Sequence, residues 1–117
     1  MDTISLRLPL KDEYITSVRL TVGGLCAVMD FDVDTTEDYK VCVTESLLIL
    51  KRCGYKSVQV AFTLGETLKT KLSAEDKSGD KETGEDDISF ALLNALIGNA
   101  TFLKDSDGDV YSIAFEG

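Results

Sequence analysis

The chain has 117 residues, with 12 basic and 21 acidic side chains, a formal net charge of −9 and no histidine. This length predicts one domain, residues 1–117, which can bury roughly 65 per cent of its unfolded surface without metals or disulfides. The charge repels nucleic acid and anionic lipid, no apolar run approaches the length of a membrane span, and the lack of histidine excludes Ser/His/Asp triads and argues against zinc chemistry.

The three cysteines favour a reducing compartment. Cys26, Cys42 and Cys53 show no CxxC spacing and fall in stretches with helical periodicity. The start, "MDTISLRLPL", has neither a basic leader nor a long apolar run. We therefore expect three buried thiols acting as small hydrophobic side chains, in a cytoplasmic protein.

A strand and an amphipathic helix are predicted first. Residues 4–10 alternate apolar and polar, which is typical of a half-buried strand. Over residues 12–29 the apolar side chains recur at helical spacing and form a stripe that faces a core. Gly23 and Gly24 lie inside this helix at a cost of about 1 kcal/mol each relative to alanine. They suggest that another backbone passes close by, from an adjacent helix or from a partner.

A second helix is predicted to start after "DFDVD" and to end near Cys53. Asp34, Thr35 and Thr36 offer side-chain oxygens to the free amides of the first turn. Gly54 supplies the stop signal.

One carboxylate interrupts the apolar second half of this helix. Glu45 shares a ridge with Val41, Ile49 and Arg52, because residues three and four apart stack on one helical face. From spacing alone, Glu45 is a boundary residue whose carboxylate pairs with Arg52 or reaches to water.

A hairpin and an acidic segment follow. Residues 58–64 and 68–74 alternate apolar and polar, with Gly65 and Glu66 at the turn between them. Residues 75–87, "EDKSGDKETGEDD", are all charged, Gly, Ser or Thr. This composition favours a solvated, mobile surface loop over a ligand site.

The remaining elements are a helix and two strands. Residues 88–99 are apolar almost all round, which predicts a buried helix ended by Gly98 or Asn99. Two strands follow over 100–104 and 110–116. Five short strands and three helices predict an α+β fold, a two-layer sandwich with a mostly antiparallel five-stranded sheet and the helices on one face.

The turn "DSDGD" between the last two strands partly matches a calcium-binding loop. Asp105, Asp107 and Asp109 occupy positions one, three and five of an EF-hand loop, and Glu116 stands at position twelve. Position six requires glycine but is Val110. A hairpin turn rich in Asp and Gly is the favoured interpretation, and a calcium-responsive acidic module is the weaker alternative.

Residues 8–46, "LPLKDEYITSVRLTVGGLCAVMDFDVDTTEDYKVCVTES", resemble the opening of the bacterial anti-sigma factor serine kinases that govern sporulation and general stress. The similarity lies in the "EY...VRLT..G" helix and in "ED.KV.V.E" at the start of the second helix. The order of elements agrees with that family through Phe115. The resemblance implies the histidine kinase-like ATPase fold shared with gyrase and the large heat-shock chaperone.

The family's first motif is a helical Glu followed four residues later by Asn. The resemblance makes Glu45 the general base toward the attacking hydroxyl. The Asn, whose amide oxygen would ligate magnesium, is replaced by Ile49. An isoleucine offers no oxygen to a hard cation, so the resemblance predicts that the metal position is lost.

The other two ATP motifs are also incomplete. The second, Asp-x-Gly-x-Gly, is matched in part by "DKSGD": Asp76 stands where the adenine amino group would be read, Gly79 follows, and Ser78 replaces the first glycine. The third is a Gly-x-Gly run at the start of the last helix, where residues 86–90 read "DDISF" and place aspartates at the phosphate position. We expect neither ATP nor magnesium as a cofactor.

The resemblance also implies the partners. An arginine of the family's first helix contacts the sigma factor and its antagonist, and Arg19 corresponds to it. We hypothesise an anti-sigma-factor-like binding protein with a degenerate kinase site, a pseudokinase, that holds a sigma factor or an anti-anti-sigma-type protein and forms a homodimer through its first strand and helix. The alternative is an active serine kinase that uses Mg-ATP, with Glu45 as base and Asp76 at the adenine.

Overall fold

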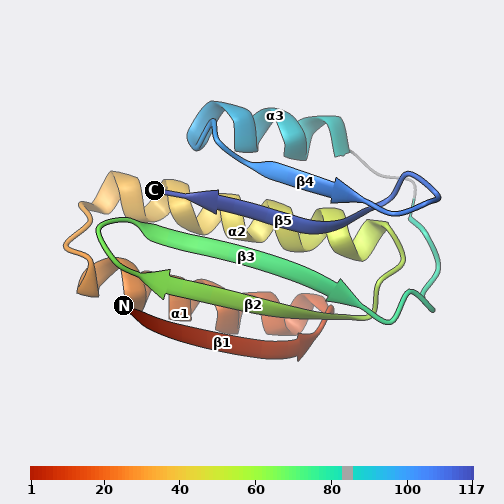
Figure 1. The fold of residues 1–117 in the computed structure, drawn as a ribbon, viewed down its shortest axis with the longest axis horizontal. Coiled ribbons are helices and arrows are strands. Elements are labelled where there is room, and N and C mark those ends of the chain that lie inside the picture. The colour runs from red at the N-terminus through yellow and green to blue at the C-terminus, as the bar shows by residue number, and fades with distance from the viewer. Residues whose placement is uncertain (83–85) are drawn as a thin grey trace.

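The computed structural model describes residues 1–82 and 86–117 (Figure 1). The elements in chain order are β1 (Asp2–Pro9), α1 (Asp12–Val28), α2 (Val33–Arg52), β2 (Ser57–Leu64), β3 (Leu68–Glu75), α3 (Asp86–Leu96), β4 (Thr101–Lys104) and β5 (Val110–Glu116). Part of the predicted acidic loop, residues 83–85, lies outside the described residues. Within the described ranges, no helix combines the length and the apolarity needed to cross a bilayer.

The strands form one antiparallel sheet in the order β1-β2-β3-β5-β4. In the view of Figure 1, α1 and α2 lie behind the sheet, α3 lies beside its β4 edge, and the front face of the sheet is open. The predicted two-layer α+β sandwich is confirmed, and it is the arrangement expected of a histidine kinase-like ATPase fold. β1 and β4 are the two edges of the sheet.

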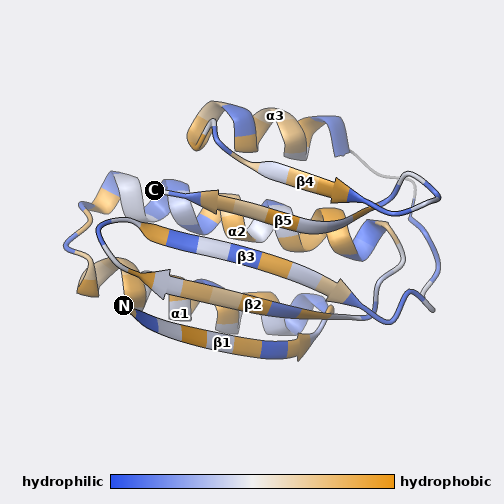
Figure 2. Cartoon of the chain, in the orientation of Figure 1, coloured by the Kyte–Doolittle hydropathy of each residue, from blue (hydrophilic) through white to orange (hydrophobic). Residues whose placement is uncertain are grey.

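Alternation along the strands creates the two faces. Val58, Val60 and Phe62 of β2 are completely buried against the helices, and Lys69 and Lys71 of β3 are exposed on the open face. Figure 2 shows the same alternation of hydrophobic and hydrophilic residues along the strands. A period of two on a half-covered sheet therefore fixes which side chains reach the core.

A buried tyrosine joins α2 to the middle of the sheet. The Tyr39 hydroxyl donates to the Leu68 carbonyl oxygen at 2.8 Å and lies 2.7 Å from the Thr70 hydroxyl. Its ring meets Phe31 and Phe115 edge to face, at centroid distances of 6.1 and 5.3 Å. Burial is the main cause that raises the pKa of this phenol far above its ordinary value. Tyr39 therefore stays neutral and acts as a hydrogen-bonded core residue.

Two helix predictions are corrected by the structure. α2 starts at Val33, earlier than predicted, because the Asp32 side chain accepts from the Thr35 amide at 2.7 Å and is the N-cap. α3 is not buried all round: only Ser89 and Leu93 are buried, and Ile88 is 53% exposed. The helix has a single covered side, because it packs at the end of the two-layer sandwich.

The cysteines are as predicted. Cys26, Cys42 and Cys53 are free thiols, and all three are buried. Burial raises the pKa of each, that of Cys42 to about 11. The thiols are therefore protonated at neutral pH and pack as small apolar groups.

The two helical glycines have different surroundings. A Cβ on Gly23 would lie 3.0 Å from the Cε atom of the Lys40 side chain, whereas a Cβ on Gly24 would meet nothing within 4 Å. We predicted that another backbone passes close to these glycines, and within the chain this prediction is wrong. Gly23 accommodates a side chain of α2, and Gly24 faces open space.

Candidate functional site

The middle of α2 carries Glu45 and Ile49, the two positions that correspond to the family's first motif, and they are buried to different extents. Ile49 is completely buried in the core. Glu45, one turn earlier, is half-buried and has no ion pair within the described residues. The expected boundary position of Glu45 is confirmed, but of its two expected environments the pairing with Arg52 is wrong, because Arg52 bonds to α3. The position that a magnesium-binding Asn would occupy is filled by an apolar side chain packed in the core.

Arg52 connects the last turn of α2 to the first turn of α3. Its Nη1 atom donates to Asp86 Oδ1 at 3.0 Å and to the Ser89 hydroxyl, also at 3.0 Å. The Ser89 side chain is buried. Acidic residues in a first helical turn interact favourably with the helix dipole, and here one of them also pairs with arginine. The start of α3 thus carries a carboxylate, Asp86, that is already paired with a positive charge of the same chain, Arg52.

The segment of residues 76–82, called the strap below, lies against the end of α2. Lys56 N donates to Asp76 O at 2.9 Å, Gly79 N to Gly54 O at 2.8 Å, and Glu82 N to Arg52 O at 2.9 Å. The strap is solvated as predicted, with most side chains exposed. Its backbone, however, is anchored at these three points.

Gly79 is explained by this docking. A Cβ on Gly79 would lie 2.9 Å from Gly54 O, and a Cβ on Gly54 would lie 2.8 Å from Gly79 O. Gly54 also has a φ of +90°, which favours glycine. Two backbones can approach this closely only without side chains, so Gly79 has a structural role that needs no nucleotide.

Asp76, the predicted adenine-reading residue, is exposed at the end of β3. Its φ is +60°, and its carboxylate accepts from the Ser78 hydroxyl. Aspartate tolerates this left-handed conformation better than most side chains. The structure places Asp76 and Gly79 in the strap, whereas Glu45 lies two turns before the end of α2.

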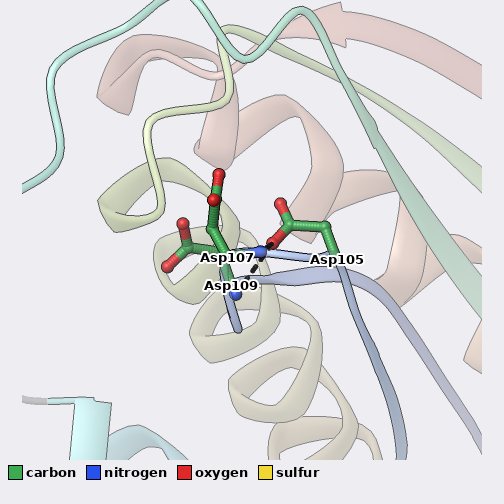
Figure 3. A group of neighbouring side chains, drawn as sticks. All are labelled: Asp105, Asp107 and Asp109. Carbon is green, nitrogen blue, oxygen red and sulfur yellow. Dashed lines mark hydrogen bonds between the residues drawn. The ribbon is translucent and has the colours of Figure 1, made fainter.

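The three aspartates of the β4–β5 turn surround a lysine. Figure 3 shows Asp105, Asp107 and Asp109 on one tight turn, where Asp105 Oδ1 accepts from the amides of the other two at 2.9 and 3.0 Å. Lys77 Nζ lies 2.6 Å from Asp105 Oδ2, 3.1 Å from Asp107 Oδ2 and 2.8 Å from Asp109 Oδ2. The carboxylate oxygens that could hold a metal ion lie within 4.8 Å of one another. The Lys77 ammonium takes the central position in this cluster.

Further contacts extend this cluster. Lys81 Nζ lies 2.6 Å from Asp109 Oδ2, and the Tyr55 hydroxyl donates to Asp105 Oδ2 at 2.9 Å. The hydrogen bond from Lys77 holds the pKa of Asp105 well below its ordinary value, and the two lysines do the same for Asp109. The carboxylates raise the pKa of Lys77. The favoured hairpin turn is therefore correct, with the carboxylates balanced by lysines from the strap.

Arg19, the predicted partner-binding residue, is half-buried between two helices. Its Nη1 atom donates to the Thr44 hydroxyl at 2.9 Å, and that hydroxyl donates to the Lys40 carbonyl oxygen. The arginine is therefore positioned by α2 and is not a freely solvated side chain. Two hollows on the open face of the sheet border Lys69 and Glu116, and none of Glu45, Asp76, Gly79 and Arg19 lines either of them.

The comparisons with known proteins identify kinase relatives at low identity. The chain is 25% identical to serine-protein kinase RsbW of Bacillus mycoides over 126 aligned positions, covering 89% of this chain and 79% of the relative. It is 29% identical to serine-protein kinase RsbW of Listeria monocytogenes over 93 positions, covering 74% of this chain and 59% of the relative. No family model matches the chain. These relatives support the resemblance to the serine kinase family.

Sequence reasoning missed Lys77 and assigned Arg52 to the wrong partner. No local signal indicated the position of Lys77, because it depends on which strand lies beside β3 in the sheet. The pairing of β3 with β5, with Ser73 opposite Ser112, places the strap beside the aspartate turn. Nothing in the spacing of α2 could have indicated that Arg52 would bond to Asp86, which follows it by 34 residues.

Proposed function

We propose that the protein is an anti-sigma-factor-like regulatory binding protein whose kinase site is degenerate and whose function is independent of nucleotide. The observation that carries this proposal is the burial of Ile49 in the core of α2. Magnesium binds to triphosphates through oxygen ligands, and the family's ligand position has none here. Without the metal, a chain of net charge −9 has little to offset the charge of a triphosphate.

Two further contacts support this function. The first turn of α3, where phosphate would meet free amides, carries Asp86 and Asp87, and Asp86 is already paired with Arg52. The retained glycine, Gly79, is packed against Gly54. The first turn of α3 and Gly79 therefore each have another role in the fold.

The proposed partner is a sigma factor or an anti-anti-sigma-type protein in the cytoplasm. Its docking surface is α1, with Arg19 held in place by Thr44. Leu20 and Val28 of the same helix are 72% and 70% exposed, which gives α1 apolar area for a protein contact. The proposal also includes a homodimer formed through β1 and α1. β1 is an edge strand, so its free backbone groups can pair with a strand of a second copy.

Calorimetric titration with Mg-ATP tests nucleotide independence. We expect no binding heat from the wild-type protein at micromolar concentrations. The titration is repeated with Asp76→Asn, and with Asp80→Asn as the control, because Asp80 is an exposed carboxylate of the same strap. Micromolar binding that Asp76→Asn abolishes and Asp80→Asn preserves would refute the proposal.

The second candidate is an active ATP-dependent serine kinase acting on an anti-anti-sigma-type partner. Two observations favour it: the relatives are named serine-protein kinases, and the half-buried Glu45 has no ion pair within the described residues. In this function Glu45 takes the proton of the attacking serine hydroxyl as the γ-phosphoryl group leaves ADP.

Transfer of labelled γ-phosphate to a purified anti-anti-sigma-type protein separates the two candidates. We expect no transfer above the level seen with Glu45→Gln. Glu37→Gln is the matched control, because Glu37 is an exposed carboxylate of the same helix that contacts Lys40. Transfer by the wild type and by Glu37→Gln, but not by Glu45→Gln, would establish the kinase.

A further inference from the structure

The strap and the β4–β5 turn are joined mainly by charge. Lys77 reaches three carboxylates and Lys81 reaches one, with nitrogen–oxygen distances between 2.6 and 3.1 Å. The side chains of Lys77, Asp105 and Asp109 are 26%, 23% and 19% exposed, whereas those of Asp107 and Lys81 are 68% and 56% exposed. The centre of the cluster is therefore shielded from solvent, and its outer members are not. Networks of this kind are the exception to the rule that surface ion pairs contribute little.

The strap has few other contacts. Lys51 Nζ lies 3.8 Å from Glu82 Oε1, and Lys77 Nζ lies 5.8 Å from the centre of the Tyr55 ring. The side chains of the strap are polar or absent, so almost no apolar surface holds it against α2. Its backbone makes three hydrogen bonds to residues 52–56, and each such bond contributes only about 0.5–1.5 kcal/mol net. Segments with few apolar contacts open locally at low free-energy cost.

We propose that Lys77 and Lys81 form an electrostatic latch that fixes the strap over the end of α2, and that loss of the positive charge on Lys77 releases the strap while the rest of the fold stays intact. The latch depends on the charge of a lysine that fills an aspartate cluster, a position where a metal ion could otherwise sit. It does not depend on whether the protein binds nucleotide.

The surroundings of Lys77 make the latch insensitive to pH near neutrality. The groups facing it are the carboxylates of the β4–β5 turn and the Tyr55 hydroxyl, with Lys81 and the Cys53 thiol nearby. The pKa values of Asp105 and Asp109 are lowered, and burial followed by the bond to Asp105 raises the pKa of Tyr55 to about 12. Lys77, Lys81, Asp105, Asp109 and Tyr55 therefore keep their charge states between about pH 6 and pH 8, the range in which an ordinary histidine titrates. Salt, or chemical neutralisation of the lysine, is what opens the latch.

Residue-resolved amide hydrogen exchange tests the latch. In Lys77→Gln we expect the amides of Gly79 and Glu82, which donate to Gly54 and Arg52, to exchange at least about tenfold faster than in the wild type, with core amides of β2 unchanged. Lys77→Arg keeps the charge and should stay within about threefold of the wild type. Lys71→Gln, an exposed lysine of the open sheet face, is the matched control and should have no effect on these amides.

Three results decide the outcome. Faster exchange confined to the strap in Lys77→Gln, and in the wild type at about 1 M salt, where screening is strongest, supports the latch. Unchanged protection of Gly79 in Lys77→Gln overturns it. Faster exchange in Lys77→Arg equal to that in Lys77→Gln also overturns it, because the effect would then come from packing and not from charge.

Discussion

The middle of α2 and its C-terminal end are held by different forces. Leu47, Ile49 and Leu50 are completely buried and pack against the sheet and its neighbours. A few residues later, Lys51 pairs with Asp12 at 3.1 Å and Arg52 with Asp86 at 3.0 Å, and the strap lies over this end. One helix thus passes from an apolar core to a charged surface within a single turn.

The two parts of α2 therefore contribute differently to the molecule. An apolar residue at position 49 adds to the core, and a buried isoleucine contributes about 1.5–3 kcal/mol relative to an exposed one. At the charged end, Arg52 and Lys77 are paired with aspartates of the chain itself. The apolar region fixes the architecture, and the charged region is where a binding property can be gained or lost.

The largest effect is expected in the apolar region. Leu47→Ala should lower the free energy of unfolding by about 2–5 kcal/mol, because it removes buried methyl groups and leaves a cavity. Urea denaturation at neutral pH measures the change. Leu20→Ala is the control: this leucine is also helical but 72% exposed, and its loss should change stability by less than about 0.5 kcal/mol beyond helix propensity. Equal effects of the two substitutions would contradict the proposed core.

The next effect comes from the buried hydroxyl of Tyr39. Tyr39→Phe keeps the ring contacts with Phe31 and Phe115 but removes the hydroxyl that bonds to Leu68 O and Thr70. We expect a loss of about 1–3 kcal/mol in thermal or urea unfolding, because a buried polar group is left without its partner. Tyr14→Phe, at a 41% exposed position, should be close to neutral. A neutral Tyr39→Phe would mean that water replaces the lost hydroxyl.

Acid should affect the charged region in a definite direction. The pKa of Asp105 is lowered in the folded state, first by the hydrogen bond from Lys77, so its protons bind more tightly to the unfolded chain. Its contribution to stability is therefore present above its unfolded pKa of about 4 and is lost as the pH falls below that value. Unfolding measured from pH 6 to pH 2 should show a smaller loss in Asp105→Asn than in the wild type. The same slope in both proteins would exclude this contribution.

The smallest expected changes in stability come from replacing two glycines by alanine, and they have opposite signs. Gly24→Ala should stabilise the protein by about 0.5–1 kcal/mol, because alanine favours a helix and its Cβ meets open space. Gly79→Ala should destabilise the strap, because the new Cβ would lie 2.9 Å from Gly54 O. Thermal unfolding measures the first, and proteolysis within the strap measures the second. Stabilisation by both substitutions would show that the strap is not docked as described.

The fold could be predicted from the sequence because its elements are encoded locally. Alternation in residues 58–64 and 68–74 and the helical period of residues 12–29 each identify an element and its buried side, and both are confirmed. The start of α2 was placed too late, because Asp34, Thr35 and Thr36 competed as caps with Asp32. Local signals mark a helix end only to within a turn.

The candidate site was less predictable, because its contacts join distant segments. The Asp105, Asp107 and Asp109 pattern favoured a hairpin turn over a calcium site, and the lysine that pairs with these carboxylates lies almost thirty residues earlier in the chain. The partner of Glu45 was sought along its own helix, whereas Arg52 turns to α3. The roles proposed for Glu45, Asp76, Gly79 and Arg19 toward a ligand or partner stay predictions.

The reactivity of the three buried thiols can report which part of the molecule unfolds first. Cys26 is a buried residue of α1 and Cys42 of α2, and Cys53 caps the end of α2, close to the strap. A thiol-reactive dye should label Cys53 first when that corner opens, and the other two only when the helices leave the sheet. The order of labelling would then separate local from global unfolding without any engineered probe.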